Sequence, residues 1–255
     1  SINSSAKVVA INRCTKALTQ NRKPTLAVQA DAGAFLRLLA TTAQTKDYAD
    51  WHTTIATTEE KRSAEIKHFA SQETAPINPL DLLQRLEALL PDRSTLVVDG
   101  GDFVGTASYI LSPREPLSWL DPGVFGTLGV GGGFALGAAL ARPNAETWLI
   151  YGDGSSAYSL AEFDTMARHD LPVIALIGTD GSWAQIAREQ VEVLGDAVGT
   201  ELIKNDYHTV AEGYGAVGLL LNDPAQIDAT IKAAQKFAAA GRPVVINAHI
   251  GPTDF

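Results

Sequence analysis

The amino-acid sequence predicts an α/β fold, a doubly wound parallel sheet with helices on both faces. Short β-branched runs alternate with stretches of helical periodicity along most of the chain, as in parallel sheets with crossover helices. Two of these runs, VIALI at 173–177 and VVINA at 244–248, are almost uninterruptedly apolar. Strands without an alternating polar face are buried on both sides, so we expect both faces of this sheet to be covered.

Composition restricts the classes of function. The 255 residues are 45% hydrophobic, enough for one large domain, or one domain and a piece of another. A net charge of -9 argues against nucleic acid as a partner, although a bound metal ion can still recruit a small anion. The single cysteine, Cys14, excludes an internal disulfide and favours a reducing compartment, so we expect a cytoplasmic protein. No run of 18 apolar residues occurs, and no membrane segment is expected.

The first part of the chain predicts two strands and a helix. Residues 8–11 form a buried strand and residues 25–28 a second one, after which Asp31 caps a helix through about Leu39. Residues 46–72 are polar with helical spacing and read as a connecting segment. The chain starts at a serine and enters a strand almost at once, so we expect a processed or incomplete polypeptide.

The segment ETAPINP at 73–79 predicts a boundary followed by a helix. Asn78 is the expected N-cap and Pro79 the first helical residue, at the start of a helix over 79–90. The elements expected after it are strand 95–99, a glycine-rich segment 123–133 leading into a small-residue helix to 141, strand 147–151, a helix to 169 with Ser159 and Glu162 as capping box, strand 172–178, helices 182–191 and 206–214, strand 218–221, helix 224–240 and strand 243–250.

Three loops of unusual composition leave strands at the edge where open α/β sheets bind ligands. They cover residues 100–103, 152–156 and 179–183. Asp153 lies between glycines whose backbone a ligand can approach closely, but its carboxylate alone would repel a phosphate. A divalent cation resolves this conflict, because Mg²⁺ prefers carboxylate and phosphate oxygens, and Asp180 and the Ser182 carbonyl could add ligands. A Gly-Asp-Gly tripeptide by itself is equally compatible with a plain turn.

The run GDGSSAYSLAEFDTMARHDLPVIALIGTDGSW at 152–183 resembles the diphosphate-binding motif of thiamine-diphosphate enzymes. The residue pattern of this run is similar to that of the acetolactate-synthase-like, 2-hydroxyacyl-CoA lyase and benzaldehyde lyase branches of this superfamily. The resemblance implies that residues 78–255 form the thiamine-diphosphate (pyrophosphate)-binding domain. Residues 1–45 would then be the C-terminal part of a Rossmann-like central domain, preceding it, and residues 46–77 a linker.

The resemblance also implies roles for single residues. Mg²⁺ would be bound by the side chains of Asp153 and Asp180 and by the carbonyl of Ser182. The Gly126 carbonyl would accept from the aminopyrimidine, and Leu128 would bend the cofactor in a catalytic role. The remaining expected cofactor contacts are Gly101, Asp102, Phe103, Gly152, Gly154, Ser155, Ser156, Trp183 and Ala184.

Some positions depart from the family pattern or have open interpretations. Asp180 stands where the family usually has Asn, and Leu128 where it often has Met. Gln185, like Trp183, either contacts the substrate, in a catalytic role for Gln185, or packs near it. His208 either faces the active site or lies on a helix surface, and Arg188 and Glu189 belong to a solvated helix face.

The implied activity is a carbon–carbon lyase or carboligase acting on 2-oxo acids, aldehydes or 2-hydroxyacyl-CoA. No stretch resembles the pyrimidine-binding domain whose glutamate activates the cofactor, so a further chain or segment must supply it. A homo- or hetero-oligomer is expected. One alternative is a non-catalytic cofactor-binding or assembly subunit. Another is a nucleotide-binding oxidoreductase, although the glycines at 129–133 lack the spacing of a dinucleotide fingerprint.

Overall fold

The computed structural model of the chain describes residues 2–43 and 47–252. Contacts divide the chain into two units, Ser1–Glu59 and Glu60–Phe255. The division between them falls inside the segment 46–77 that the sequence assigned to a linker. The expected domain limits at residues 1, 45, 46 and 255 lie outside the described residues, and the three-part division stays a prediction.

The first unit contains two short strands and a helix. β1 (Val9–Asn12) pairs in parallel with β2 (Leu26–Gln29), and α1 (Ala32–Thr42) follows. Asp31 caps α1 as predicted, since its Oδ1 accepts from the Ala34 N–H at 2.8 Å. The prediction of a buried first strand is wrong: no residue of β1 is buried, and Val9 is 47% exposed. The reason is that no residue of α1 is buried either, so β1 has no closed core to enter.

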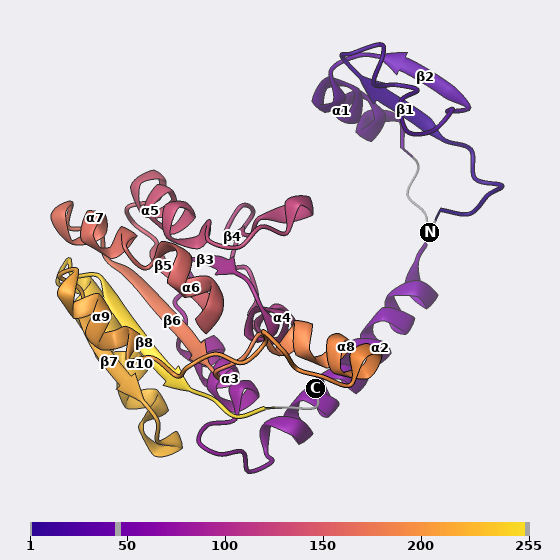
Figure 1. Cartoon of the computed structure of the whole chain (residues 1–255). Coiled ribbons are helices and arrows are strands. Elements are labelled where there is room, and N and C mark those ends of the chain that lie inside the picture. The colour runs from indigo at the N-terminus through magenta and orange to yellow at the C-terminus, as the bar shows by residue number, and fades with distance from the viewer. Residues whose placement is uncertain (1, 44–46, 253–255) are drawn as a thin grey trace. The chain divides into compact units, whose positions relative to one another are not determined.

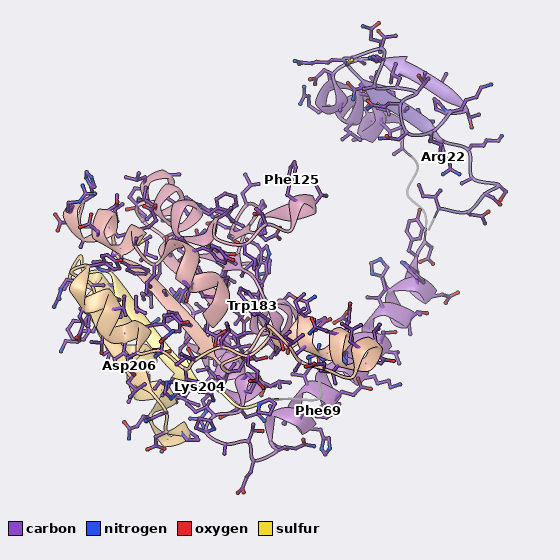
Figure 2. All side chains as sticks on the ribbon, viewed as in Figure 1. Arg22, Phe69, Phe125, Trp183, Lys204 and Asp206 are labelled. Carbon is purple, nitrogen blue, oxygen red and sulfur yellow. The ribbon has the colours of Figure 1, made fainter. Side chains whose placement is uncertain are left out.

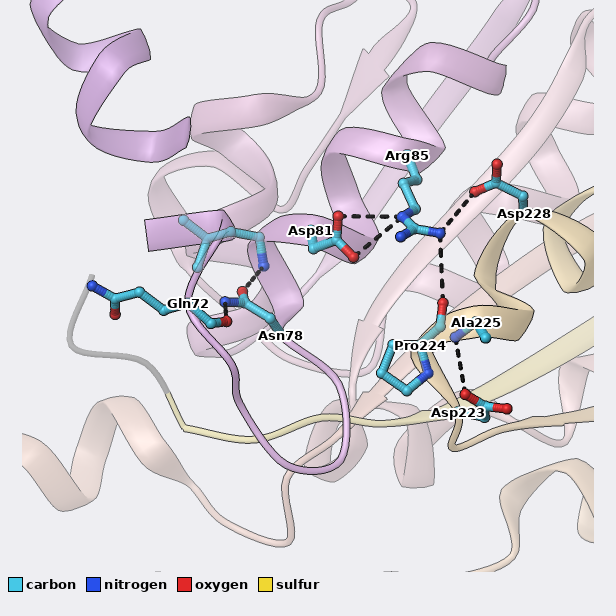
Figure 3. Close-up of polar contacts among 9 residues, drawn as sticks. Gln72, Asn78, Asp81, Arg85, Asp223, Pro224, Ala225 and Asp228 are labelled. Atoms are coloured by element: carbon cyan, nitrogen blue, oxygen red, sulfur yellow. Dashed lines mark hydrogen bonds and ion pairs between the residues drawn. The ribbon is translucent and has the colours of Figure 1, made fainter. Parts of the chain in front are cut away.

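One asparagine joins the connecting helix to the second unit. α2 (Ala49–Ala70) ends near Asn78, whose amide donates to the Phe69 and Gln72 carbonyls at 2.8 and 2.9 Å. The Asn78 Oδ1 accepts from the Leu80 N–H at 2.9 Å, which confirms the predicted N-cap of α3 (Pro79–Leu89) (Figure 3).

A small ionic network then ties α3 to a later part of the second unit. The Arg85 guanidinium lies 3.2 Å from Asp81 and 3.3 Å from Asp228 (Figure 3). The three side chains are partly to largely exposed, so these pairs set the position of α3 more than they add stability.

The second unit is built on a parallel sheet with the strand order β4-β3-β5-β6-β8-β7 (Figure 1). All of its pairings are parallel, which confirms the predicted fold class. The strands are β3 (Ser94–Asp99), β4 (Trp119–Leu120), β5 (Glu146–Gly152), β6 (Val173–Thr179), β7 (Val217–Leu221) and β8 (Val244–His249). The two-residue edge strand β4 carries too short a pattern to be predicted.

Helices cover both faces of this sheet (Figure 1). Along β5, Trp148 and Ile150 enter a core with α3, α4 (Asp102–Ile110) and α10 (Ile227–Ala239). Leu149 and Tyr151 enter the opposite core. That core contains residues of α5 (Gly131–Ala141), α7 (Glu162–Arg168) and α9 (Tyr207–Gly213). The remaining elements are η1 (Gly123–Phe125), α6 (Asp153–Ser159), α8 (Ala184–Leu194) and η2 (Pro224–Gln226).

Local predictions fail where helices begin directly after strands. The segment 100–103, expected as a loop, already contains the start of α4, and α6 starts at Asp153 itself. The predicted capping box of Ser159 and Glu162 is wrong. Ser159 is the last residue of α6, and its buried hydroxyl lies 2.6 Å from the Tyr151 hydroxyl, so it is not available to cap α7.

Candidate functional site

A cavity of about 220 Å³ lies where β3, β5 and β6 end. Since the strands are parallel and adjacent, the segments that follow them meet at one edge of the sheet. With the exception of Ser156, all of the predicted metal, cofactor and catalytic residues line this cavity. They are Gly101, Asp102, Phe103, Gly126, Leu128, Gly152, Asp153, Gly154, Ser155, Asp180, Ser182, Trp183, Ala184 and Gln185, joined by Gly100, Gly178 and Ile186.

Two carboxylates face this cavity from neighbouring strand ends. Asp153, only 2% exposed, accepts from the Gly154 N–H at its Oδ1 and from the Gly181 N–H at its Oδ2, both at 2.8 Å. The second bond joins the end of β5 to the loop that follows β6. In that loop the Asp180 Oδ1 accepts from the Ser182 N–H at 2.8 Å. The two aspartates, 27 residues apart in sequence, therefore share one cavity.

Burial and mutual repulsion act on the pKa of these carboxyls. Burial raises the pKa of Asp153, against hydrogen bonds from the Gly181 and Gly154 N–H groups. Burial, and next the charge of Asp153, raise the pKa of Asp180 to about 6. A pair of carboxylates that resist ionisation this way gains from a bound cation, because the cation favours the charged form of both.

The acidic pair needs oxygens from elsewhere to complete a metal shell. Within residues 2–43 and 47–252, no group of three or more His, Cys, Asp or Glu side chains could hold a metal ion. Mg²⁺ is bound in many proteins by one or two carboxylates, with ligand phosphates and water filling the shell. The residues present fit this kind of site.

Glycines at the cavity are required by close approaches. Gly100 has φ +73°, and a Cβ there would overlap Leu128 and lie 2.9 Å from the Ser155 Cβ. A Cβ on Gly154 would overlap the ring of Trp183. The indole ring of Trp183 therefore covers one face of Gly154 (Figure 2 labels Trp183). Gly154 still lines the cavity, and its contact with the cofactor stays a prediction.

The two serines of the motif use their hydroxyls within the protein. Ser155 donates to the Asp99 carbonyl, and Ser156 to the Asp153 carbonyl at 2.7 Å. Ser155 lines the cavity, and the cofactor contacts expected of the two serines stay predictions. Ser156 is fully buried and does not line the cavity, so it stabilises the turn that carries Asp153.

The apolar wall comes from the segment that follows η1. Gly126 ends η1 with φ +55°, and Leu128, 36% exposed, lies against Gly100 at the cavity. Phe125, beside them in sequence, is 88% exposed (Figure 2). Gln185 lines the cavity from the first turn of α8 and is exposed.

Sequence reasoning missed the buried Asp99 at the end of β3. Its carboxylate accepts from the Gly129 N–H at 3.0 and 3.1 Å and from the Gly131 N–H at 2.7 Å. An aspartate that ends an apolar strand ahead of a glycine-rich segment was the available signal. Close approaches account for three glycines of this run, since an added Cβ on Gly129, Gly131 or Gly132 would lie 2.7 Å from its nearest neighbouring atom.

Two further residues had predicted settings outside the cavity or open between two placements. Arg188 lies on a solvated helix face as predicted, with its side chain 56% exposed, and it also pairs with the cavity residue Asp102 at 2.8 Å. His208 is half-buried and lies 3.3 Å from the Asn247 amide. His208 does not line the cavity, which disagrees with its placement in the active site.

Fold and cavity together define a parallel α/β domain with an acidic, glycine-lined ligand site at the carboxyl edge of its sheet. Residues 99–248 match the family described as thiamine pyrophosphate enzyme, C-terminal TPP binding domain. The chain belongs to this family, which confirms the resemblance and thiamine diphosphate as the cofactor of the domain.

Comparison with individual proteins narrows the choice among the branches of this family. The chain is 47% identical to 2-hydroxyacyl-CoA lyase 2 of Danio rerio over all of this chain and 42% of the relative. It is also 47% identical to the Homo sapiens protein of that name, over 98% of this chain and 41% of the relative. An acetolactate synthase large subunit of Mycobacterium tuberculosis is 32% identical, over 98% of this chain and 45% of that protein. The chain thus spans less than half the length of these relatives.

A solved structure supports the fold alone. A thiamine diphosphate-dependent 4-hydroxybenzoylformate decarboxylase of Rhodococcus jostii RHA1 superposes with a TM-score of 0.77 at 20% identity, over all of this chain and 46% of that one. In the part of the chain that the structure describes, no helix has the length and apolar character needed to cross a membrane.

Proposed function

We propose that this chain supplies the diphosphate and Mg²⁺ half of the active site of a thiamine-diphosphate-dependent carbon–carbon lyase or carboligase. The observation that carries the proposal is the pair of cavity-facing carboxylates, Asp153 and Asp180, at the ends of adjacent strands. The names of the most similar relatives favour 2-hydroxyacyl-CoA as the substrate class, with 2-oxo acids and aldehydes as the wider range.

In this proposal the residues of the chain bind and orient the cofactor. Asp153, Asp180 and the Ser182 carbonyl bind Mg²⁺. Backbone groups at 100–103 and 152–155, which line the cavity, would contact the diphosphate. The bound cofactor supplies carbanion stabilisation, and the protein supplies orientation and electrostatics.

The remaining cavity residues act on the organic part of the cofactor and on the substrate. The Gly126 carbonyl would accept a hydrogen bond from the aminopyrimidine, and Leu128 would support the cofactor from the apolar wall of the cavity. Trp183, Ala184 and Gln185 lie at the start of α8, on the side proposed for the substrate.

The other half of the site comes from a pyrimidine-binding domain with an activating glutamate, in another chain or another segment. The active particle is then a homo- or hetero-oligomer. A cytoplasmic setting is part of the proposal, supported by the single, exposed Cys14.

The decisive experiment is Asp153→Ala in the native particle, with calorimetric titration of thiamine diphosphate in Mg²⁺. We expect the affinity to fall by more than about 100-fold, because a metal ligand should matter at least as much as its supporting residues. The matched control is Asp164→Ala, which removes an exposed carboxylate paired with Arg168 on α7. Unchanged affinity in Asp153→Ala would contradict the proposal. A particle that binds the cofactor without turnover would favour the non-catalytic subunit instead.

A further inference from the structure

The segment 200–205 forms a wall along the loop that carries Asp180. The Leu202 N–H donates to the Gly181 carbonyl and the Trp183 N–H to the Thr200 carbonyl, both at 2.8 Å. Ser182 also forms an antiparallel bridge with Glu201. The position of this segment is therefore tied to the proposed metal loop residue by residue.

A buried asparagine fixes both partners of this pairing. Asn247 on β8 is fully buried, and its amide donates to the Asn205 carbonyl at 3.0 Å. Its Oδ1 accepts from the Thr179 hydroxyl at 2.6 Å. Thr179 directly precedes Asp180 in the sequence, so Asn247 holds the strand end with the carboxylate and the segment opposite it.

Lys204 is the cation that this arrangement brings beside the proposed metal loop, next to the residues that line the cavity rather than among them (Figure 2 labels Lys204). Its side chain lies along Gly181, where an added Cβ would be 3.0 Å from the Lys204 Cγ and 3.4 Å from its Cε. The ammonium nitrogen is one bond beyond Cε. Its positive charge lowers the pKa of both Asp153 and Asp180, against the larger opposite effect of burial.

The ammonium group is uncommitted in the described residues. No carboxylate of residues 2–43 or 47–252 forms an ion pair with Lys204. By contrast, Asp102 is already paired with Arg188 at 2.8 Å. Lys204 therefore remains available for an anionic ligand.

The charges of the site leave a need for such a cation. Two carboxylates already balance the charge of one Mg²⁺, so the metal leaves the charge of a diphosphate largely unmet. Lysine presents a compact charge with freely rotating donors, which suits phosphate oxygens. We propose that Lys204 is a further cofactor-binding residue of this site, whose ammonium group binds a diphosphate oxygen. This inference rests on the proposed function.

The test measures binding of Mg²⁺ with inorganic pyrophosphate, and with thiamine diphosphate, to the native particle by calorimetry. Lys204→Met keeps the length of the side chain and removes its charge, and Lys204→Arg keeps the charge. The control Lys236→Met removes the same charge from the exposed face of α10. We expect roughly 10-fold weaker binding of both ligands in Lys204→Met alone, the usual weight of one charged hydrogen bond. Added salt should weaken binding less in this variant than in the wild type.

Each other outcome has a definite meaning. Equal affinities in Lys204→Met and Lys236→Met, with binding still lost in Asp153→Ala, would overturn the role of Lys204 and leave the proposed function intact. If Lys204→Met weakens binding and Lys204→Arg weakens it equally, the proposed role for the positive charge of residue 204 would also be overturned. If the wild-type native particle binds neither ligand in Mg²⁺, the proposed function and this inference both fail. The melting temperature should be the same in all three lysine variants, because these side chains are exposed.

Discussion

Asp99 and Asp153 stand at the ends of adjacent strands and have different surroundings. Asp99 is the last residue of β3, and Asp153 directly follows β5. Both are buried, and burial raises the pKa of both carboxyls. All of the hydrogen bonds that the Asp99 carboxylate accepts come from the glycine segment at 129–131, and Asp99 does not line the cavity.

The Asp153 carboxylate differs from that of Asp99 in its neighbours and in its access to the cavity. It accepts two backbone hydrogen bonds, lines the cavity, and repels the neighbouring Asp180. Asp99 and Asp153 share residue type and burial, and both lie where a strand of the sheet ends. What separates a structural carboxylate from a proposed metal ligand is therefore the set of groups that surround it, and above all a second carboxylate.

The sharpest test of this comparison is the pair Asp99→Asn and Asp153→Asn. In Asp99→Asn an amide N–H₂ group faces buried N–H donors, so we expect the free energy of unfolding in urea to fall by about 2–4 kcal/mol. In Asp153→Asn the amide N–H₂ group also faces one backbone N–H donor, but the substitution removes the repulsion with Asp180, so the loss should be smaller, about 1–2 kcal/mol. Cofactor affinity should show the reverse order. Equal destabilisation by the two substitutions would break the comparison.

A second test is to change the glycine that Asp99 holds. An added Cβ on Gly131 would lie 2.7 Å from the Asp99 Cβ and 2.9 Å from the Leu149 Cδ1. Gly131→Ala should therefore cost about 1–3 kcal/mol of unfolding free energy in urea. Gly137→Ala on the same helix meets nothing within 4 Å and should gain up to about 1 kcal/mol from helix propensity. A neutral Gly131→Ala would show that Asp99 does not need this close approach.

The last test is the pH dependence of stability. The pKa of Asp180 is raised in the folded chain to about 6, so the folded state binds more protons than the unfolded state. Without divalent ions, the contribution of Asp180 to stability should fall as pH rises from about 4 to about 6. With Mg²⁺, the stabilisation by the metal should be lost as pH falls through about 6. Melting temperatures of the wild type and of Asp180→Asn, with and without Mg²⁺, isolate this contribution. Identical pH profiles would contradict it.

Much of the site was predictable because local signals happened to coincide with it. The acidic residues Asp153 and Asp180 follow apolar strands in a parallel pattern, and parallel strands bring their ends to one edge. The N-caps Asp31 and Asn78 were predictable for the same reason, since a cap bonds within three residues. The predicted capping box of Ser159 was wrong because its hydroxyl forms a hydrogen bond with the Tyr151 hydroxyl, a partner that only the folded sheet provides.

The sequence by itself determined the parallel α/β fold, the family and the two acidic strand ends, because periodicity and motif spacing are properties of neighbouring residues. Tertiary structure alone decided that Trp183 covers Gly154, that Asp99 holds the glycine segment and that Asn247 brings Lys204 to the metal loop. Each of these contacts joins residues about 30 or more positions apart in the sequence. Such partners are chosen by how side chains pack in three dimensions, and the local pattern around either residue does not contain that information.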